Sequence, residues 1–148
     1  MRKNIAPNSI MELEKWMKDN CYNFSSYSIN GNYIDEGFSI EKNGNLFLWN
    51  YQERGIKRAI KEFQSEIEVV EYGFNKILND KWAKAHCIGF SKNEKDINDL
   101  VSIILEMNID YFQDKIIYDD WRPVFRVFVF GCDVNKVLFL KDKYYKHP

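Results

Sequence analysis

The chain has 148 residues, of which 45% are hydrophobic and 29% are charged, and its formal net charge is −1. A chain of this length buries about 68–70% of the surface that its unfolded form exposes, so a core is possible without disulfides or a metal. The nearly neutral charge weighs against direct binding of nucleic acid, and no apolar run approaches the roughly 18 residues that a membrane-spanning helix needs. The N-terminus also lacks the apolar stretch of a signal peptide, so we expect a cytoplasmic protein.

The first part of the chain predicts one helix and most of a sheet. Ser9 is followed by Glu12 at the spacing of a capping box, so a helix is expected from there to about Asn20. After Tyr22 the apolar residues alternate, and Asn43-Gly44 suits the positive φ angles of a tight hairpin turn. This pattern predicts antiparallel strands over about 24–29, 33–42, 45–52 and 57–63.

Two further helices are predicted from capping boxes. Ser65 with Glu68 opens the first, and Gly73 inside it indicates close packing against the sheet, because glycine is otherwise unfavourable in a helix. Its apolar positions are Ile67, Val70, Phe74, Ile77, Leu78 and Trp82. Ser91 with Glu94 opens the second helix. The inward positions of that helix are Ile97, Leu100, Val101, Ile104 and Leu105. Both helices are expected to cover a sheet with these apolar faces.

The C-terminal part predicts two strands and a last element that fits either a helix or a strand. A short strand is expected over 116–118, and residues 125–130 form a strand that is apolar on both faces and therefore central in the sheet. Asp133 suits the cap of a final helix, although residues 137–140 also fit a strand. The whole pattern predicts one α+β domain over residues 1–148, an antiparallel β-sheet with helices packed against it.

Few side chains suited to catalysis occur in the chain. His86 directly precedes Cys87, and adjacent residues of a regular element point in different directions, so the two do not predict a catalytic pair. His147 is the penultimate residue. Cys21, Cys87 and Cys132 are far apart and never form C-x-x-C, so we expect reduced thiols rather than disulfides or zinc ligands. We therefore expect no catalytic residue, no metal and no cofactor.

Three basic residues, Lys57, Arg58 and Lys61, fall in one predicted strand. Strand alternation predicts that Lys57 and Lys61 share one face while Arg58 points to the other. Charged residues of this kind are typical of a solvated edge strand, because lysines on an edge discourage aberrant pairing.

The strongest charge cluster lies between Glu94 and Asp120, where eight acidic residues accompany two basic ones. Aromatic residues are interleaved with these carboxylates, and aromatics surrounded by polar groups are typical of protein interfaces. The predicted partner-binding residues are Asp96, Asp99, Glu106, Asp110, Tyr111, Asp114, Tyr118, Asp119, Asp120 and Trp121. The alternative is that the acidic residues form the solvated face of a helix and of the loop after it.

The segment from Leu46 to Phe74 joins an apolar strand, a Glu-Arg-Gly turn, a second strand and an amphipathic helix. Its defining positions are Trp49, Tyr51, Glu53, Arg54, Gly55, Phe63, Ser65, Glu66, Glu68, Tyr72 and Phe74. This arrangement resembles the one in families of bacterial immunity proteins of polymorphic-toxin and contact-dependent growth inhibition systems. In the turn, Gly55 is expected to supply a positive φ, while Glu53 and Arg54 form an exposed pair or Arg54 contacts a nearby carboxylate.

The resemblance implies a protein that binds and neutralises one cognate antibacterial toxin domain by stoichiometric binding. A nuclease toxin, such as an RNase or tRNase, is the expected partner, because its phosphate-binding cleft is positive and an acidic protein complements it. Changing Asp114, Asp119 and Asp120 to lysine is then expected to weaken binding without lowering the melting temperature. The alternative is a cytoplasmic chaperone or adaptor for a secreted protein, and a hydrolase that uses His86 or a carboxylate pair comes third.

Overall fold

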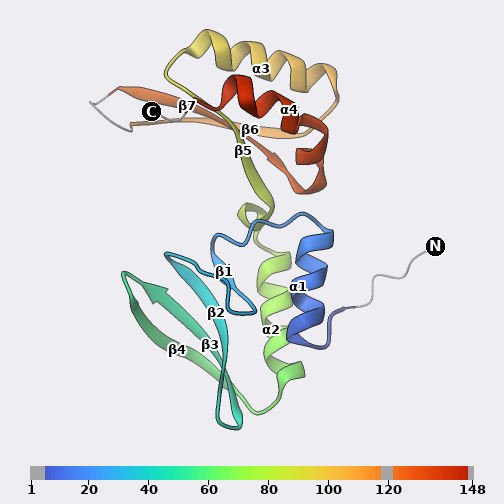
Figure 1. The fold of residues 1–148 in the computed structure, drawn as a ribbon, viewed down its shortest axis with the longest axis vertical. Coiled ribbons are helices and arrows are strands. Elements are labelled where there is room, and N and C mark those ends of the chain that lie inside the picture. The colour runs from blue at the N-terminus through green and yellow to red at the C-terminus, as the bar shows by residue number, and fades with distance from the viewer. Residues whose placement is uncertain (1–5, 118–121, 147–148) are drawn as a thin grey trace, which may run out of the picture. The chain divides into compact units, whose positions relative to one another are not determined.

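The computed structural model describes residues 6–117 and 122–146. The chain divides into two compact units, Met1–Ala83 and Lys84–Pro148, and each has its own sheet, helices and hydrophobic core. Helices packed on sheets in both units confirm the predicted α+β class (Figure 1). The strands fall into two sheets where one was expected, and the single domain over residues 1–148 stays a prediction.

The first unit consists of two helices and a four-stranded sheet in the order β1-β2-β3-β4. Its elements are α1 (Ile10–Asp19), β1 (Tyr27–Ser28), β2 (Gly37–Asn43), β3 (Leu46–Glu53), β4 (Ile56–Phe63) and α2 (Glu66–Leu78), and the short 3-10 helix η1 (Lys81–Lys84) follows. The hairpins β2–β3 and β3–β4 are antiparallel, as predicted, and β4 is an edge strand of the sheet, with β1 at the other edge.

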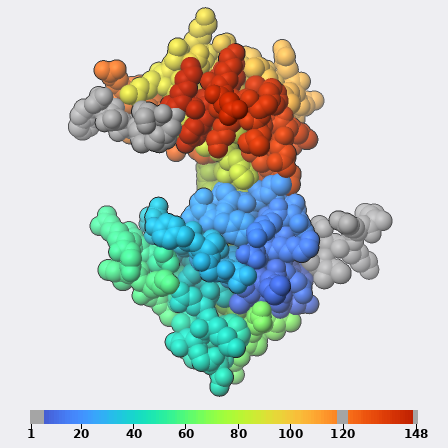
Figure 2. Space-filling model, in the orientation of Figure 1, coloured from blue at the N-terminus to red at the C-terminus, as the bar shows by residue number. Residues whose placement is uncertain are grey.

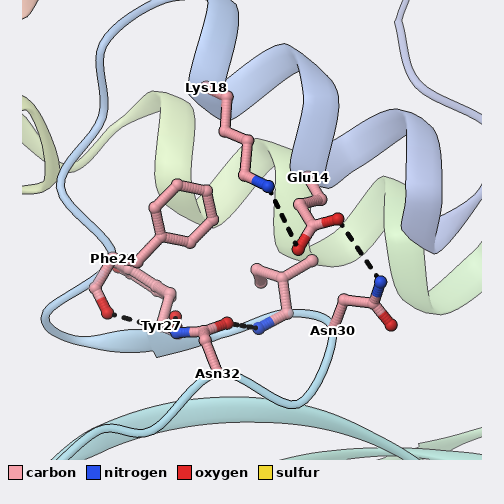
Figure 3. Close-up of polar contacts among 7 residues, drawn as sticks. Glu14, Lys18, Phe24, Tyr27, Asn30 and Asn32 are labelled. Atoms are coloured by element: carbon pink, nitrogen blue, oxygen red, sulfur yellow. Dashed lines mark hydrogen bonds and ion pairs between the residues drawn. The ribbon is translucent and has the colours of Figure 1, made fainter.

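The strand predicted over 24–29 is reduced to two residues, and it pairs with β2 in parallel rather than antiparallel. The loop after it is held by Asn32, whose side chain accepts a hydrogen bond from the Ile29 amide at 3.0 Å and donates to the Tyr27 carbonyl at 2.9 Å (Figure 3). Asn30 donates to Glu14 of α1 at 3.3 Å. Side chains that bond to nearby backbone in this way compete with strand pairing, which explains the short β1.

Both predicted helix caps of the first unit are confirmed. The Ser9 hydroxyl accepts from the Glu12 amide at 3.1 Å, and the Ser65 hydroxyl accepts from the Glu68 amide at 3.3 Å. The capping oxygens satisfy amides that have no partner within the helix, so each helix begins where the sequence predicts.

The core of the first unit forms where α1 and α2 pack with the sheet around the fully buried Trp49. A Cβ atom on Gly73 would lie 2.9 Å from Cζ3 of Trp49, so the predicted close packing of this glycine is confirmed. The inward placement of Ile67, Leu78 and Trp82 is wrong, because these side chains are 50%, 47% and 50% exposed. The buried stripe of α2 passes instead through Val69, Val70, Gly73 and Ile77.

The second unit consists of two helices and a three-stranded antiparallel sheet in the order β5-β7-β6. Its elements are β5 (Ala85–Ser91), α3 (Glu94–Glu106), β6 (Tyr111–Ile117), β7 (Pro123–Phe130), the 3-10 helix η2 (Gly131–Asp133) and α4 (Val134–Tyr144). The central position of β7 is confirmed, and residues 137–140 belong to a helix rather than a strand. Strand β5 was not predicted from the sequence.

Helices α3 and α4 pack against β5 and β7 on one face of the second sheet (Figure 1). Ile88, Leu100, Val127 and Val137 are fully buried between them. A Cβ atom on Gly89 would lie 2.5 Å from Cδ2 of Leu100, so glycine allows α3 to approach β5 closely. The packing therefore fixes which side of α3 faces away from the core.

Candidate functional site

Helix α3 positions the first group of predicted partner-binding residues. Asn93 caps this helix, since its side-chain oxygen accepts from the Lys95 amide at 3.0 Å, so the predicted Ser91 cap is wrong. The Ser91 hydroxyl instead accepts a hydrogen bond at 3.0 Å from the amide of Asn93, the residue that caps the helix. Because Asn93 is the cap, Glu94 lies in the first turn of α3, where its carboxylate stabilises the positive end of the helix dipole.

Asp99 and Glu106 lie on the exposed side of α3. The buried residues Ile97, Leu100 and Ile104 define the inward stripe. Asp99 and Glu106 are two turns apart and both are exposed, so they share the outward face. Neither carboxylate forms an ion pair within the described parts of the chain. Both charges are therefore open to a partner.

Asp96 differs from these residues because its charge is already compensated. Its Oδ2 atom lies 2.6 Å from Nζ of Lys146, and the Asp96 side chain is 26% exposed. This ion pair joins α3 to the chain after α4. Asp96 therefore contributes to the structure of the second unit, and its role in partner binding stays a prediction.

Asp114 is also a structural residue. It lies opposite Arg126 on the neighbouring strand, and the pair is bidentate: Nε donates to Oδ1 at 2.9 Å and Nη2 donates to Oδ2 at 2.6 Å. The carboxylate raises the pKa of Arg126 above its ordinary value through this hydrogen bond. The guanidinium lies 5.0 Å from the ring of Phe128 as well. Replacing Asp114 by lysine would thus lower stability, contrary to the sequence-based expectation.

A hollow of about 410 Å³ lies beside the N-terminal half of α3 and the edge strand β6. Its lining residues are Glu94, Ile97, Asn98, Gln113, Asp114, Lys115 and Phe125. Most of these side chains are polar or charged, and Phe125 supplies an apolar wall. The hollow therefore suits a polar side chain of a protein partner better than an apolar small molecule.

The C-terminal end of α3 carries a mixed acidic and apolar surface. Asp110 is exposed just before β6, and Leu105 and Met107 flank Glu106 with exposures of 57% and 38%. Leu105 was predicted to point inward, so this apolar contribution was missed. Tyr111 is half-buried and packs against the core of its unit, which leaves it a smaller part in any interface than predicted.

Four of the predicted partner-binding residues, Tyr118, Asp119, Asp120 and Trp121, lie outside the described residues. In the described part of this region, four carboxylates without ion pairs and two exposed apolar side chains are open to a partner. They lie along α3 and the stretch after it up to residue 110, and we call this set the acidic surface: Glu94, Asp99, Glu106, Asp110, Leu105 and Met107.

Among the described residues, His86 and Cys87 do not form a catalytic pair. His86 and Cys87 are consecutive in β5, so their side chains leave opposite faces of the sheet, as predicted. Burial raises the pKa of the Cys87 thiol, which makes it a poor nucleophile. Cys87 is a free cysteine, as expected.

The described residues contain little that suits a metal site or a membrane-spanning segment. Among these residues, no group of three or more His, Cys, Asp or Glu side chains is placed to hold a metal ion. Within the same ranges, no helix has the length and apolar character required to cross a membrane. Comparisons with protein-family models, with curated proteins and with solved structures find no match. The case for a function therefore depends on the surfaces of the chain itself.

Proposed function

We propose that this chain is an immunity protein, which binds one cognate antibacterial toxin domain and neutralises it by stoichiometric binding. The observation that carries the proposal is the acidic surface, where four carboxylates lack ion pairs among the described residues and two apolar side chains are exposed beside them. Charges of one sign increase the encounter rate with a partner of opposite sign, and apolar side chains contribute the affinity.

A nuclease is the partner that this surface suits best. A nuclease cleft is positive because it holds phosphates, and an acidic protein competes for the same groups. The approach of the acidic surface to such a cleft would place carboxylates where the phosphates of the substrate bind. In this account inhibition is exclusion of the substrate, and no turnover by the inhibitor is required.

The segment that resembles immunity proteins has the local structure that the resemblance implies. β3, a two-residue turn at Arg54-Gly55, β4 and the Ser65-capped α2 follow one another in the expected order. Gly55 has φ +80°, as expected for this turn. This agreement in order and turn geometry supports the proposal.

Location in the cytoplasm belongs to the same proposal, because the toxin would act there. A reducing cytoplasm keeps most cysteines as thiols, and Cys87 is a free cysteine in the structure. Thiol labelling in intact cells tests the point. Labelling of Cys21 and Cys132 in the native protein would support a cytoplasmic location, and protection of both until a reductant is added would contradict it.

Growth of cells tests the proposal most simply. The C-terminal domain of a large secreted protein encoded next to this chain would be expressed alone and together with it. Rescue by the native chain is expected, and a variant with Asp99→Lys, Glu106→Lys and Asp110→Lys should fail to rescue. Asp142→Lys, an exposed change on α4 of the same unit, is the control and should rescue fully. Failure of the native chain to rescue would contradict an immunity function.

A chaperone or adaptor for a secreted protein is the second candidate. The observation that favours it is the exposed apolar surface of α4, where Leu138 is 53% exposed and Phe139 is 67% exposed. A chaperone would bind an unfolded segment of the secreted protein through such side chains and would not neutralise a folded toxin domain. This function would be favoured over immunity if the chain bound only an unfolded form of the secreted protein and if Phe139→Ser abolished that binding.

A further inference from the structure

The tip of the β3–β4 hairpin contains an arginine in a conformation that costs stability. Arg54 has φ +52° and Gly55 has φ +80°, and Glu53 pairs directly with Ile56, so the turn has two central residues with positive φ. Such turns prefer Asn-Gly, because a left-handed conformation costs a residue such as arginine about 1 kcal/mol. Arg54 is exposed and forms no ion pair with any described residue, so the predicted contact with a carboxylate is absent there. Local stability does not explain an arginine at this position.

A hollow of about 290 Å³ lies beside this tip and is lined by Tyr51, Glu53, Arg54, Ile56 and Arg58. The Tyr51 hydroxyl donates to Glu36 at 2.9 Å, which fixes the ring, and the Arg58 guanidinium lies 5.7 Å from the ring centroid. Ile56 is 73% exposed. The hollow thus combines two guanidinium groups with apolar walls and one carboxylate, that of Glu53, so a positive charge remains for a carboxylate on a short chain.

Strand β4 is a free edge beside the same hollow. Among the described residues it pairs only with β3, and seven of its eight residues are exposed. Green atoms of the β3–β4 hairpin lie at the surface in Figure 2. Glu53 and Ile56 flank a two-residue turn and so form a hydrogen-bonded pair, which means that Lys57 and Ala59 direct their N–H and C=O groups away from β3. An exposed edge of this length is a template for one more strand.

The basic residues of β4 are arranged differently from the sequence-based prediction. A bulge shifts the register between Trp49 and Asn50, so Arg58 lies opposite Tyr51 and Lys61 lies opposite Trp49. Arg58 and Lys61 therefore share the helix side of the sheet, and Lys57 is on the other side, where it forms an ion pair with Glu41. Arg58 and Lys61 form no ion pair within the described ranges. Two uncompensated cations thus follow Arg54 along one face of the edge.

We propose that β4 and the hairpin tip bind an extended acidic peptide segment, which pairs with β4 as an added strand and places carboxylates on Arg54 and Arg58. The free edge offers the alternating donors and acceptors that a peptide backbone matches. Nucleic acid fits less well, because the rings of Tyr51, Phe63 and Tyr72 already lie beside the cations of Arg58 and Lys61 and are less open to base stacking. This site lies in the first unit and does not depend on the acidic surface or on the immunity proposal.

Fluorescence anisotropy with short labelled peptides tests the site in the full chain. A peptide of alternating glutamate and valine should bind, and the same peptide with lysine in place of glutamate should not. Arg54→Asn and Arg58→Gln should each lower the affinity at least fivefold. Because asparagine suits the turn better, Arg54→Asn should also keep or raise the melting temperature, so that its loss of binding cannot be attributed to unfolding. Arg122→Gln, an exposed change outside the hairpin, is the control and should bind like the native chain.

Amide hydrogen exchange locates the bound peptide. Saturation with the acidic peptide should slow exchange at Lys57 and Ala59, whose amides point away from β3 in the free protein. The proposal is overturned if both peptides bind equally, if both arginine variants retain binding, or if these amides stay unprotected in the complex. Tighter binding of single-stranded RNA, lost in the same arginine variants, would also overturn it and would assign the surface to nucleic acid.

Discussion

The ion pair between Asp114 and Arg126 should stabilise the second unit measurably, although Asp114 was predicted to be a surface charge for a partner. The two side chains lie opposite each other on β6 and β7, make two hydrogen bonds of 2.9 and 2.6 Å, and are only 26% and 30% exposed. A hydrogen bond to a charged group contributes about 1.5–3 kcal/mol, and removing one partner of a fully buried pair costs about 3–5 kcal/mol. With roughly a quarter of each side chain in water, we expect Asp114→Ala to lower the free energy of unfolding by about 2 kcal/mol.

A double-mutant cycle separates this interaction from other effects of the substitutions. Asp114→Ala, Arg126→Met and the double variant would be unfolded in urea and followed by far-UV circular dichroism, with hydrogen exchange at Val127 to confirm that the second unit is affected. Methionine keeps part of the arginine stem against Phe128. We expect a coupling energy of about 1–2 kcal/mol. The matched control is Lys15 with Asp19, an exposed pair on α1, for which the expected coupling is below about 0.5 kcal/mol. A coupling below about 0.5 kcal/mol for Asp114 with Arg126 would show that the ion pair does not stabilise the second unit, and would leave Asp114 as a partner-binding residue.

Three further predictions concern packing, capping and pH. Gly73→Ala should lower the free energy of unfolding by about 1–3 kcal/mol, because the new Cβ would lie 2.9 Å from Trp49. The same change on an exposed helix surface would raise the free energy of unfolding, so urea unfolding, which gives the sign of the change, distinguishes the two cases. Ser65→Ala should lower the free energy of unfolding by about 1 kcal/mol, because α2 loses its cap. Asp133→Ala should lower it by less than about 0.5 kcal/mol, because the Asp133 side chain makes no capping hydrogen bond. Equal effects of the two substitutions in thermal melts would contradict the assignment of the caps. Burial and the hydrogen bond to Asp80 raise the pKa of Tyr27 above 10.0, so the neutral phenol stabilises the fold fully below pH 10 and this stabilisation is lost as the pH rises further. Tyr27→Phe should therefore lower the free energy of unfolding at neutral pH but reduce its decrease at alkaline pH. An unchanged slope of stability against pH in the alkaline range would show that Tyr27 is not the titrating group.

Local signals in the sequence predict most of the first unit correctly. Ser9 and Ser65 begin helices because capping depends on residues only three positions apart. Gly55 adopts a positive φ because a two-residue hairpin turn requires that conformation. Strand β1 was predicted too long, since the side chain of Asn32 bonds to the backbone that a strand would need. Hydrophobic spacing alone did not distinguish the centre of the buried stripe on α2 from its flanks, so Ile67 was placed inside.

Features that depend on distant residues could not be predicted from the sequence. Strand β5 contains His86 and Gly89 and has little local strand character, and it forms because β7 lies beside it and α3 needs a glycine there. The bulge opposite Trp49 reverses the face of Lys61, and no local signal marks it. For the candidate site, the number of acidic residues in the sequence indicates the segment. Only the structure shows that Lys146, fifty residues away, donates a hydrogen bond to Asp96 and compensates its charge.

Calorimetric titration of the purified chain against the C-terminal domain of a large secreted protein encoded next to it measures the binding on which the proposed immunity function depends. We expect tight one-to-one binding that weakens at least tenfold when Asp99, Glu106 and Asp110 are changed to lysine, and that is unchanged by Asp142→Lys. The melting temperatures of both variants should match that of the native chain, because none of these carboxylates forms an ion pair within the described ranges. Absence of binding by the native chain, or full affinity in the triple variant, would contradict the assignment of the acidic surface as the site that neutralises a toxin.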